Sequence, residues 1–179
     1  MKIMVIITHP NMETSRVNKA WREELQKHGE ITVHELYAAY PDEKIDVARE
    51  QQLIESHDRI IFQYPMYWYS TPPLLKKWFD EVLLYGWAYG SDASKTAGKE
   101  IGVAISTYGT EASYQSTGFN RFTLQELLRP VEALAHFISA DYLPHFALSD
   151  TSNLTDERLA QSKKDYMQHI LGVKSPAVR

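Results

Sequence analysis

Short runs of apolar residues recur along the chain, and each has the length of a strand. Residues 2–8, KIMVIIT, are mostly apolar, which is typical of a strand buried on both faces. Similar runs lie at 59–65 and 100–107, a more polar one at 31–36, and a weaker one with a proline at 142–148. The sequence therefore predicts five strands.

Between these runs, apolar residues recur at helical spacing. Val17, Ala20, Trp21 and Leu25 share one face of a predicted helix that ends near Gly29. Further helices are expected at 46–57, 72–83, 121–138 and 155–171, the second of these with its prolines in the first turn, where proline is tolerated.

Strict alternation of strands and helices predicts a parallel sheet with helices on both faces, because right-handed crossovers carry each helix across the sheet. At 179 residues, the strand order 2-1-3-4-5 fits better than a six-stranded dinucleotide-binding fold. We therefore expect one α/β domain over residues 1–179, a flavodoxin-like doubly wound sandwich with a five-stranded parallel sheet.

Composition narrows the classes of function. The net charge is -4 with no basic stripe, so nucleic acid is not an expected partner. The chain has no cysteine, which excludes disulfides and thiolate catalysis, so any redox chemistry must come from a cofactor. We find neither a signal peptide, nor a run of about 20 apolar residues that could span a membrane, nor a metal-binding motif. We expect a cytoplasmic protein without metal.

Ligands of open α/β sheets bind at the carboxyl ends of the strands, near the point where the strand order reverses. Three predicted loops meet there. They follow the first, third and fourth strands, are rich in polar or aromatic residues, and read THPNMETSRVN, YPMYWYSTP and STYGTEASYQSTGFN.

The first of these loops carries Thr14, Ser15 and Asn18 at the start of a helix. Free N–H groups and the helix dipole make such a position a phosphate site. Taken alone the two hydroxyls favour an ordinary helix cap, but their position after the first strand favours the phosphate. His9 could bind the same ligand or be structural. No G-x-G-x-x-G or P-loop motif is present.

The other two loops suit a planar ring. Tyr67, Trp68 and Tyr69 lie in a predicted turn, which weakens the alternative that they only pack a core. Thr107, Tyr108 and Gly109 offer backbone donors and close approach, although this stretch alone could be a simple glycine turn. A ring on aromatic side chains with a phosphate at a helix end describes a flavin nucleotide.

The chain resembles the NAD(P)H:quinone oxidoreductases among flavodoxin-like proteins, especially the ancillary oxidoreductases of bacterial glutathione-gated potassium efflux systems. The resemblance rests on four stretches: HPNMETSRVN, YPDEKIDVAREQQLI, YPMYWYSTPPLLKKWFDEVLLYGWAYG and STYGTEASY.

The resemblance assigns cofactor contacts to each loop. They are His9, Ser15, Val17 and Asn18, with Thr14 beside them; Pro65, Met66, Tyr67, Trp68 and Tyr69; and Ser106, Thr107, Tyr108 and Gly109.

The resemblance also implies a catalytic pair. Tyr114 matches a tyrosine that works with a histidine in animal quinone reductases, and Asn120 stands where that histidine is expected. Asparagine cannot accept a proton as imidazole does, so the same relay is not available. Tyr108 replaces a smaller residue beside the ring and could restrict the shape of the substrate.

By this resemblance the protein is an NAD(P)H dehydrogenase (quinone), with FMN favoured over FAD and with NADH or NADPH as the hydride donor. The resemblance and the aromatic-rich connection at 84–98 favour a homodimer. A first alternative is a regulatory flavoprotein subunit of a potassium efflux transporter, held peripherally at the inner face of the membrane. A second is a one-electron carrier, for which the dispersed charge of -4 offers little acidic docking surface.

Overall fold

The computed structural model describes residues 1–90 and 94–172, in which six parallel strands form one sheet. The strands are β1 (Ile3–Ile7), β2 (Ile31–Glu35), β3 (Arg59–Pro65), β4 (Glu100–Ser106), β5 (Asp141–Tyr142) and β6 (Phe146–Leu148). Their order is β2-β1-β3-β4-β5, and β6 also pairs with β4. The predicted flavodoxin-like order is confirmed.

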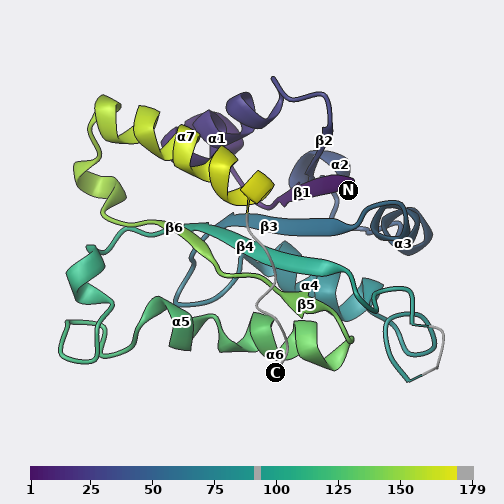
Figure 1. Ribbon diagram of the computed structural model, residues 1–179. Helices are drawn as coiled ribbons and strands as arrows, with labels where there is room; N and C mark the ends of the chain where they lie inside the picture. The colour runs from purple at the N-terminus through teal and green to yellow at the C-terminus, as the bar shows by residue number, and fades with distance from the viewer. Residues whose placement is uncertain (91–93, 173–179) are drawn as a thin grey trace.

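Helices cover both faces of this sheet (Figure 1). They are α1 (Arg16–Leu25), α2 (Leu36–Ala39), α3 (Val47–Glu55), α4 (Pro73–Val82), α5 (Leu124–Leu127), α6 (Arg129–Phe137) and α7 (Asp156–Gly172). Single 3-10 turns lie at η1 (Met12–Thr14), η2 (Glu111–Ser113) and η3 (Thr151–Asn153). Helices α1 and α7 lie side by side on one face, and α4, α5 and α6 lie on the other.

Alternation along β1 divides the core into two layers. Ile3, Val5 and Ile7 pack with the apolar faces of α1 and α7. Met4 and Ile6 point to the opposite face and pack with α4 and α6. Both faces of the strand are therefore buried, which explains its nearly continuous apolar sequence.

Two prolines change the predicted elements. The helix expected at 121–138 is two helices, because Pro130 has no N–H with which to continue the hydrogen bonding of α5. Thr123 begins α5 with a capping box to Glu126. The strand expected at 142–148 is likewise divided around Pro144 into β5 and β6, and both parts pair with β4. The short helix α2 was not predicted.

A buried carboxylate connects four elements on the α4 side of the sheet. Glu50 is fully buried, and its oxygens lie 2.8 Å from Nε2 of His34, 2.5 Å from the Tyr40 hydroxyl and 2.8 Å from Nε1 of Trp78. Burial raises the pKa of Glu50, but its hydrogen bonds and the charge of His34 outweigh burial and hold the pKa below its ordinary value. The cluster joins β2, α3 and α4 with the residue that ends α2.

We predict that Glu50→Gln lowers the free energy of unfolding by roughly 1–3 kcal/mol, because an amide nitrogen cannot accept from the donors that Glu50 satisfies. Because the pKa of Glu50 is lower in the folded than in the unfolded protein, its ionised form stabilises the fold at any pH above the unfolded pKa. This stability is lost as the pH falls through the folded pKa. Urea denaturation between neutral and acidic pH should show this dependence weakened in the variant. Glu23→Gln, at an exposed position of α1, is the control. Equal stability of Glu50→Gln and the parent would contradict a structural role.

Candidate functional site

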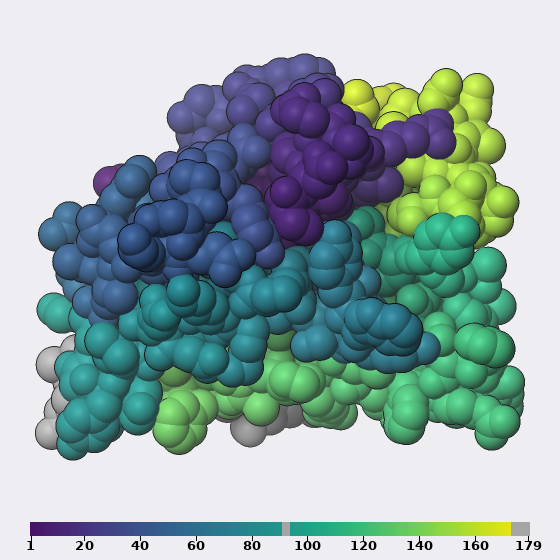
Figure 2. Space-filling view, turned by 180° about the vertical axis from the view of Figure 1, so that it is seen from behind, coloured from purple at the N-terminus to yellow at the C-terminus, as the bar shows by residue number. Residues whose placement is uncertain are grey.

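The loops that follow β1, β3, β4 and β6 meet at one edge of the sheet (Figure 1). Parallel pairing continues into these loops: Met66 N–H donates to the Ser106 carbonyl at 3.0 Å, and Thr107 N–H donates to the Leu148 carbonyl at 3.0 Å. In Figure 2 the purple N-terminal surface lies between the blue-to-teal middle of the chain and its yellow-green C-terminal part. Distant parts of the sequence thus form one surface.

The first loop ends in a capped helix. Ser15 Oγ accepts from the backbone N–H of Asn18 at 3.1 Å, so its hydroxyl proton can still be donated to a ligand. The first turn of α1 has no acidic residue. His9 Nδ1 accepts from Asn11 N–H at 3.1 Å, which leaves the proton of the neutral ring on Nε2, and burial lowers the His9 pKa. Thr14 is exposed.

A chain of buried amides and hydroxyls lies behind the loops. Asn18 is only 1% exposed, and its Nδ2 donates to Ser106 Oγ at 3.0 Å. Gln63 Nε2 donates to the Asn18 carbonyl at 3.2 Å, and the Tyr166 hydroxyl donates to Gln63 Oε1 at 3.1 Å. This chain fixes α1 against β3, β4 and α7. Asn18, Ser106 and the buried Val17 therefore lie beneath the loop surface, and their contact with a ligand stays a prediction.

The aromatic loop after β3 is a two-residue hairpin. Tyr67 and Ser70 exchange both backbone hydrogen bonds, at 3.0 and 2.9 Å. Trp68 and Tyr69 between them have φ of 46° and 63°, the left-handed region that normally favours Asn and Gly. Trp68 is 93% exposed, whereas the nearby Tyr64 is buried in the core. The hairpin thus presents aromatic rings at a backbone cost of about 1–3 kcal/mol per residue.

The loop after β4 brings Tyr114 against Gly109. A Cβ on Gly109 would lie 2.8 Å from Ser113 Oγ and 3.2 Å from the Tyr114 hydroxyl, so a larger residue would displace both. Thr107 and Tyr114 are buried, while Tyr108 is largely exposed.

Asn120 links this loop to the aromatic hairpin. The Tyr69 hydroxyl donates to Asn120 Oδ1 at 3.0 Å, and Asn120 Nδ2 donates to Ser113 Oγ at 3.2 Å. The residue at the expected histidine position is therefore a bridge between two loops.

A cavity of about 730 Å³, here called the loop cavity, lies between these segments. Of the predicted residues, it brings together Met66, Trp68, Tyr69, Tyr108, Gly109, Tyr114 and Asn120. His9 instead lines a separate hollow with Glu35 and Tyr37. The structure thus unites the second and third predicted loops around the cavity, with the first loop outside its lining.

Sequence reasoning missed the loop after β6, which adds Asp150, Ser152 and Asn153 to the same cavity. Asp150 N–H donates to the Gly109 carbonyl at 2.8 Å and so fixes this loop against the third one. The sequence contains a pattern that could have identified this loop, because the polar stretch SDTSN directly follows a strand, as in the other loops. The exposed Phe119 was missed as well.

Two features are absent from the described ranges, 1–90 and 94–172. No group of three His, Cys, Asp or Glu residues within them could hold a metal ion. No helix within them is long and apolar enough to cross a membrane.

Comparison with known proteins gives matches over nearly the whole chain. A family described as having a flavodoxin-like fold matches residues 1–170. An uncharacterized NAD(P)H oxidoreductase, YdeQ of Bacillus subtilis, is 47% identical over 100% of this chain and 91% of its own. A glutathione-regulated potassium-efflux system ancillary protein, KefF of Klebsiella pneumoniae, is 37% identical over 94% of each chain.

Solved structures agree with these sequence matches. General stress protein 14 of Treponema denticola, in complex with FMN, is 45% identical with a TM-score of 0.90 and covers 93% of this chain and 96% of its own. An NADPH-quinone reductase of P. pentosaceus is 30% identical with a TM-score of 0.86 and covers 100% of both chains.

Proposed function

Because the chain belongs to the family with the flavodoxin-like fold, we propose that it is an FMN-dependent NAD(P)H dehydrogenase acting on quinones. The observation that carries this proposal is the strained, exposed aromatic hairpin that faces the loop after β4 across a cavity of about 730 Å³. The similar NAD(P)H oxidoreductase, FMN complex and NADPH-quinone reductase support the cofactor, the donor and the acceptor.

The residues at the sheet edge fit FMN. Ser15 offers a hydroxyl proton beside the free N–H groups of α1, which suits a phosphate. The Thr8 hydroxyl directly after β1 is buried without a hydrogen-bond partner among the described residues, and a polar ligand there could supply one. Met66, Trp68 and Tyr69 would hold the flavin ring on one side.

FMN, when bound, would accept a hydride from NADH or NADPH and pass the two electrons to a quinone. The chain positions and shields the reactants. The hairpin aromatics offer ring faces, and the backbone N–H groups of Tyr108 and Gly109, which line the loop cavity, would donate to the pyrimidine edge. The Thr107 N–H already donates to the Leu148 carbonyl, so this residue would support the loop. The Tyr114 hydroxyl, held against Gly109, would donate a proton toward the charge that develops there.

A regulatory role in potassium efflux is the second candidate, favoured by the 37% identity with KefF. In that role the protein would lie peripherally at the inner face of the membrane, docked on a transporter. The two roles are compatible, since a docked subunit can keep its enzymatic activity.

We predict that Ser15→Glu lowers the affinity for FMN by about 100-fold or more, because a carboxylate at the α1 N-terminus opposes the phosphate at a cost of a few kcal/mol. Titration of the flavin-free protein, followed by quenching of FMN fluorescence, measures the change. Ser15→Gln has the same size without the charge and is the control. Parental affinity in Ser15→Glu would exclude the first loop from the site.

We predict that Tyr114→Phe slows anaerobic flavin reduction by NADH or NADPH and leaves the flavin content unchanged. A preorganised donor can contribute about 10²–10³-fold to a rate, and without the partner histidine we expect a smaller loss, about tenfold. Tyr108→Phe, which removes an exposed hydroxyl from the same cavity, is the matched control. If Tyr114→Phe keeps the parental rates in both half-reactions, Tyr114 only lines the cavity and has no part in the chemistry.

We also propose a homodimer formed through the connection at 84–98, of which residues 91–93 lie outside the described residues. Tyr85 is exposed, whereas Trp87 Nε1 donates to Glu55 within the same chain at 2.7 Å. Light scattering should therefore give twice the chain mass of 20.6 kDa, and Tyr85→Ser should weaken the association. A monomer at all concentrations would contradict the proposal.

A further inference from the structure

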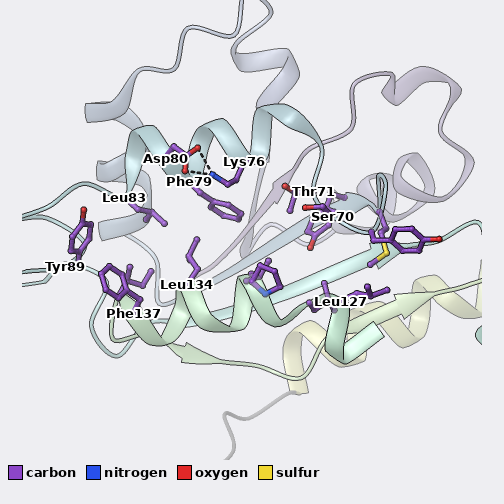
Figure 3. Close-up of a pocket in the computed structure, with 17 residues that line it drawn as sticks. Ser70, Thr71, Lys76, Phe79, Asp80, Leu83, Tyr89, Leu127, Leu134 and Phe137 are labelled. Atoms are coloured by element: carbon purple, nitrogen blue, oxygen red, sulfur yellow. Dashed lines mark hydrogen bonds and ion pairs between the residues drawn. The ribbon is translucent and has the colours of Figure 1, made fainter. Parts of the chain in front are cut away.

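A second cavity, here called the apolar groove, lies between α4 and the α5–α6 pair and has a volume of about 410 Å³ (Figure 3). Phe79 lines it from α4 and Leu83 from the position directly after α4, while Leu127 and Leu134 line it from the opposite helices. Its far end is bounded by a ring contact between Tyr89 and Phe137 at 4.9 Å.

The groove adjoins the loop cavity. Met66 and Tyr69 line both spaces, so Tyr69 lies on their common boundary. The other lining of the groove is mostly aliphatic or aromatic, with the ion pair of Lys76 and Asp80, at 2.6 Å, among its few charged residues. An apolar substituent on a ring in the loop cavity would therefore find apolar surface beyond Tyr69.

Tyr69 is held from both ends. Its backbone is fixed in the left-handed region by the paired hydrogen bonds of the hairpin, and its hydroxyl donates to Asn120 at 3.0 Å. Asn120 is itself fixed by Ser113, which accepts from its backbone N–H at 2.9 Å and from its Nδ2 at 3.2 Å. The ring of Tyr69, which is 46% exposed, therefore lies at the boundary in one defined position.

We propose that the hydrogen bond between Tyr69 and Asn120 is a specificity-determining latch that separates the loop cavity from the apolar groove. While it is closed, the enzyme favours electron acceptors that are compact rings. When it is open, the groove binds the apolar side chain of a substituted quinone. The proposal rests on the proposed function, and it gives Asn120 a positioning role that a proton relay does not require.

The test compares menadione with the same naphthoquinone ring carrying an alkyl chain, as oxidants of the reduced holoenzyme. Burial of one methylene can raise affinity about fourfold. We therefore expect Tyr69→Phe to raise the ratio of kcat/KM for the alkylated over the compact quinone by about tenfold or more. Asn120→Leu should do the same, and the double variant should add little, since both changes break one bond.

Two controls separate the latch from general effects. Tyr108 lines the loop cavity and not the groove, so Tyr108→Phe, which keeps the ring and removes only the hydroxyl, should leave the ratio unchanged. Asn120→Asp keeps an oxygen acceptor for Tyr69 and should keep the parental ratio.

Binding of the two quinones to the flavin-free protein, followed by tryptophan fluorescence, gives a second readout. Tyr69→Phe should strengthen binding of the alkylated quinone relative to menadione about tenfold. An unchanged preference in every variant by both readouts would overturn the latch. A groove filled by a second copy of the chain would give this result. Failure of the parent to bind FMN, or of NADH and NADPH to reduce it, would overturn the proposed function and the latch with it.

Discussion

Parallel pairing of β3 with β4 is the constraint on which the site depends. Because the two strands run in the same direction, both of their following loops leave from one edge of the sheet, and Met66 N–H extends the pairing to the Ser106 carbonyl at 3.0 Å. An aromatic hairpin and a glycine-containing loop are thereby placed opposite each other. Their separation is set by the backbone, so the loop cavity does not depend on flexible side chains alone.

Buried hydrogen bonds fix α1, which follows the first loop, to the same two strands, and they fix α7 to β3. Asn18, Gln63, Ser106 and Tyr166 are all buried and form one hydrogen-bonded chain across four elements. A buried amide without partners is costly, so the chain favours one position of α1 relative to the sheet. On the other face of the sheet, the hydrogen bonds of the Glu50 cluster fix the positions of α3 and α4. The two clusters lie on opposite faces of the sheet.

Local pattern was sufficient to predict most of the fold. The strand at 2–8 is apolar on both faces, and α4 has an apolar stripe after two prolines, so each could be recognised without tertiary information. Pro130 and Pro144 were ambiguous, because one proline can either end an element or be accommodated at its start. The aromatic hairpin was recognised as a turn from its position.

Contacts between distant residues could not be predicted in this way. The sequence pattern suggests that Glu50 is a surface residue of a polar helix. In the structure it is buried and hydrogen-bonded to His34 and Trp78. From the sequence, Asn120 is only a replacement for an expected histidine. The structure shows that its side chain accepts a hydrogen bond from the Tyr69 hydroxyl. Asn18 likewise has its hydrogen-bond partners on β3 and β4. In each case the partner is supplied by the topology, which the local sequence does not contain.

We propose that flavin bound in the loop cavity would transfer two electrons from a nicotinamide to a quinone. Anaerobic rapid mixing of the FMN-loaded protein with NADH or NADPH, and then with a quinone, tests it most directly. We expect complete bleaching of the flavin absorbance by at least one nicotinamide and its complete return on addition of one equivalent of quinone. Flavin that binds tightly but is reduced by neither nicotinamide would contradict the account.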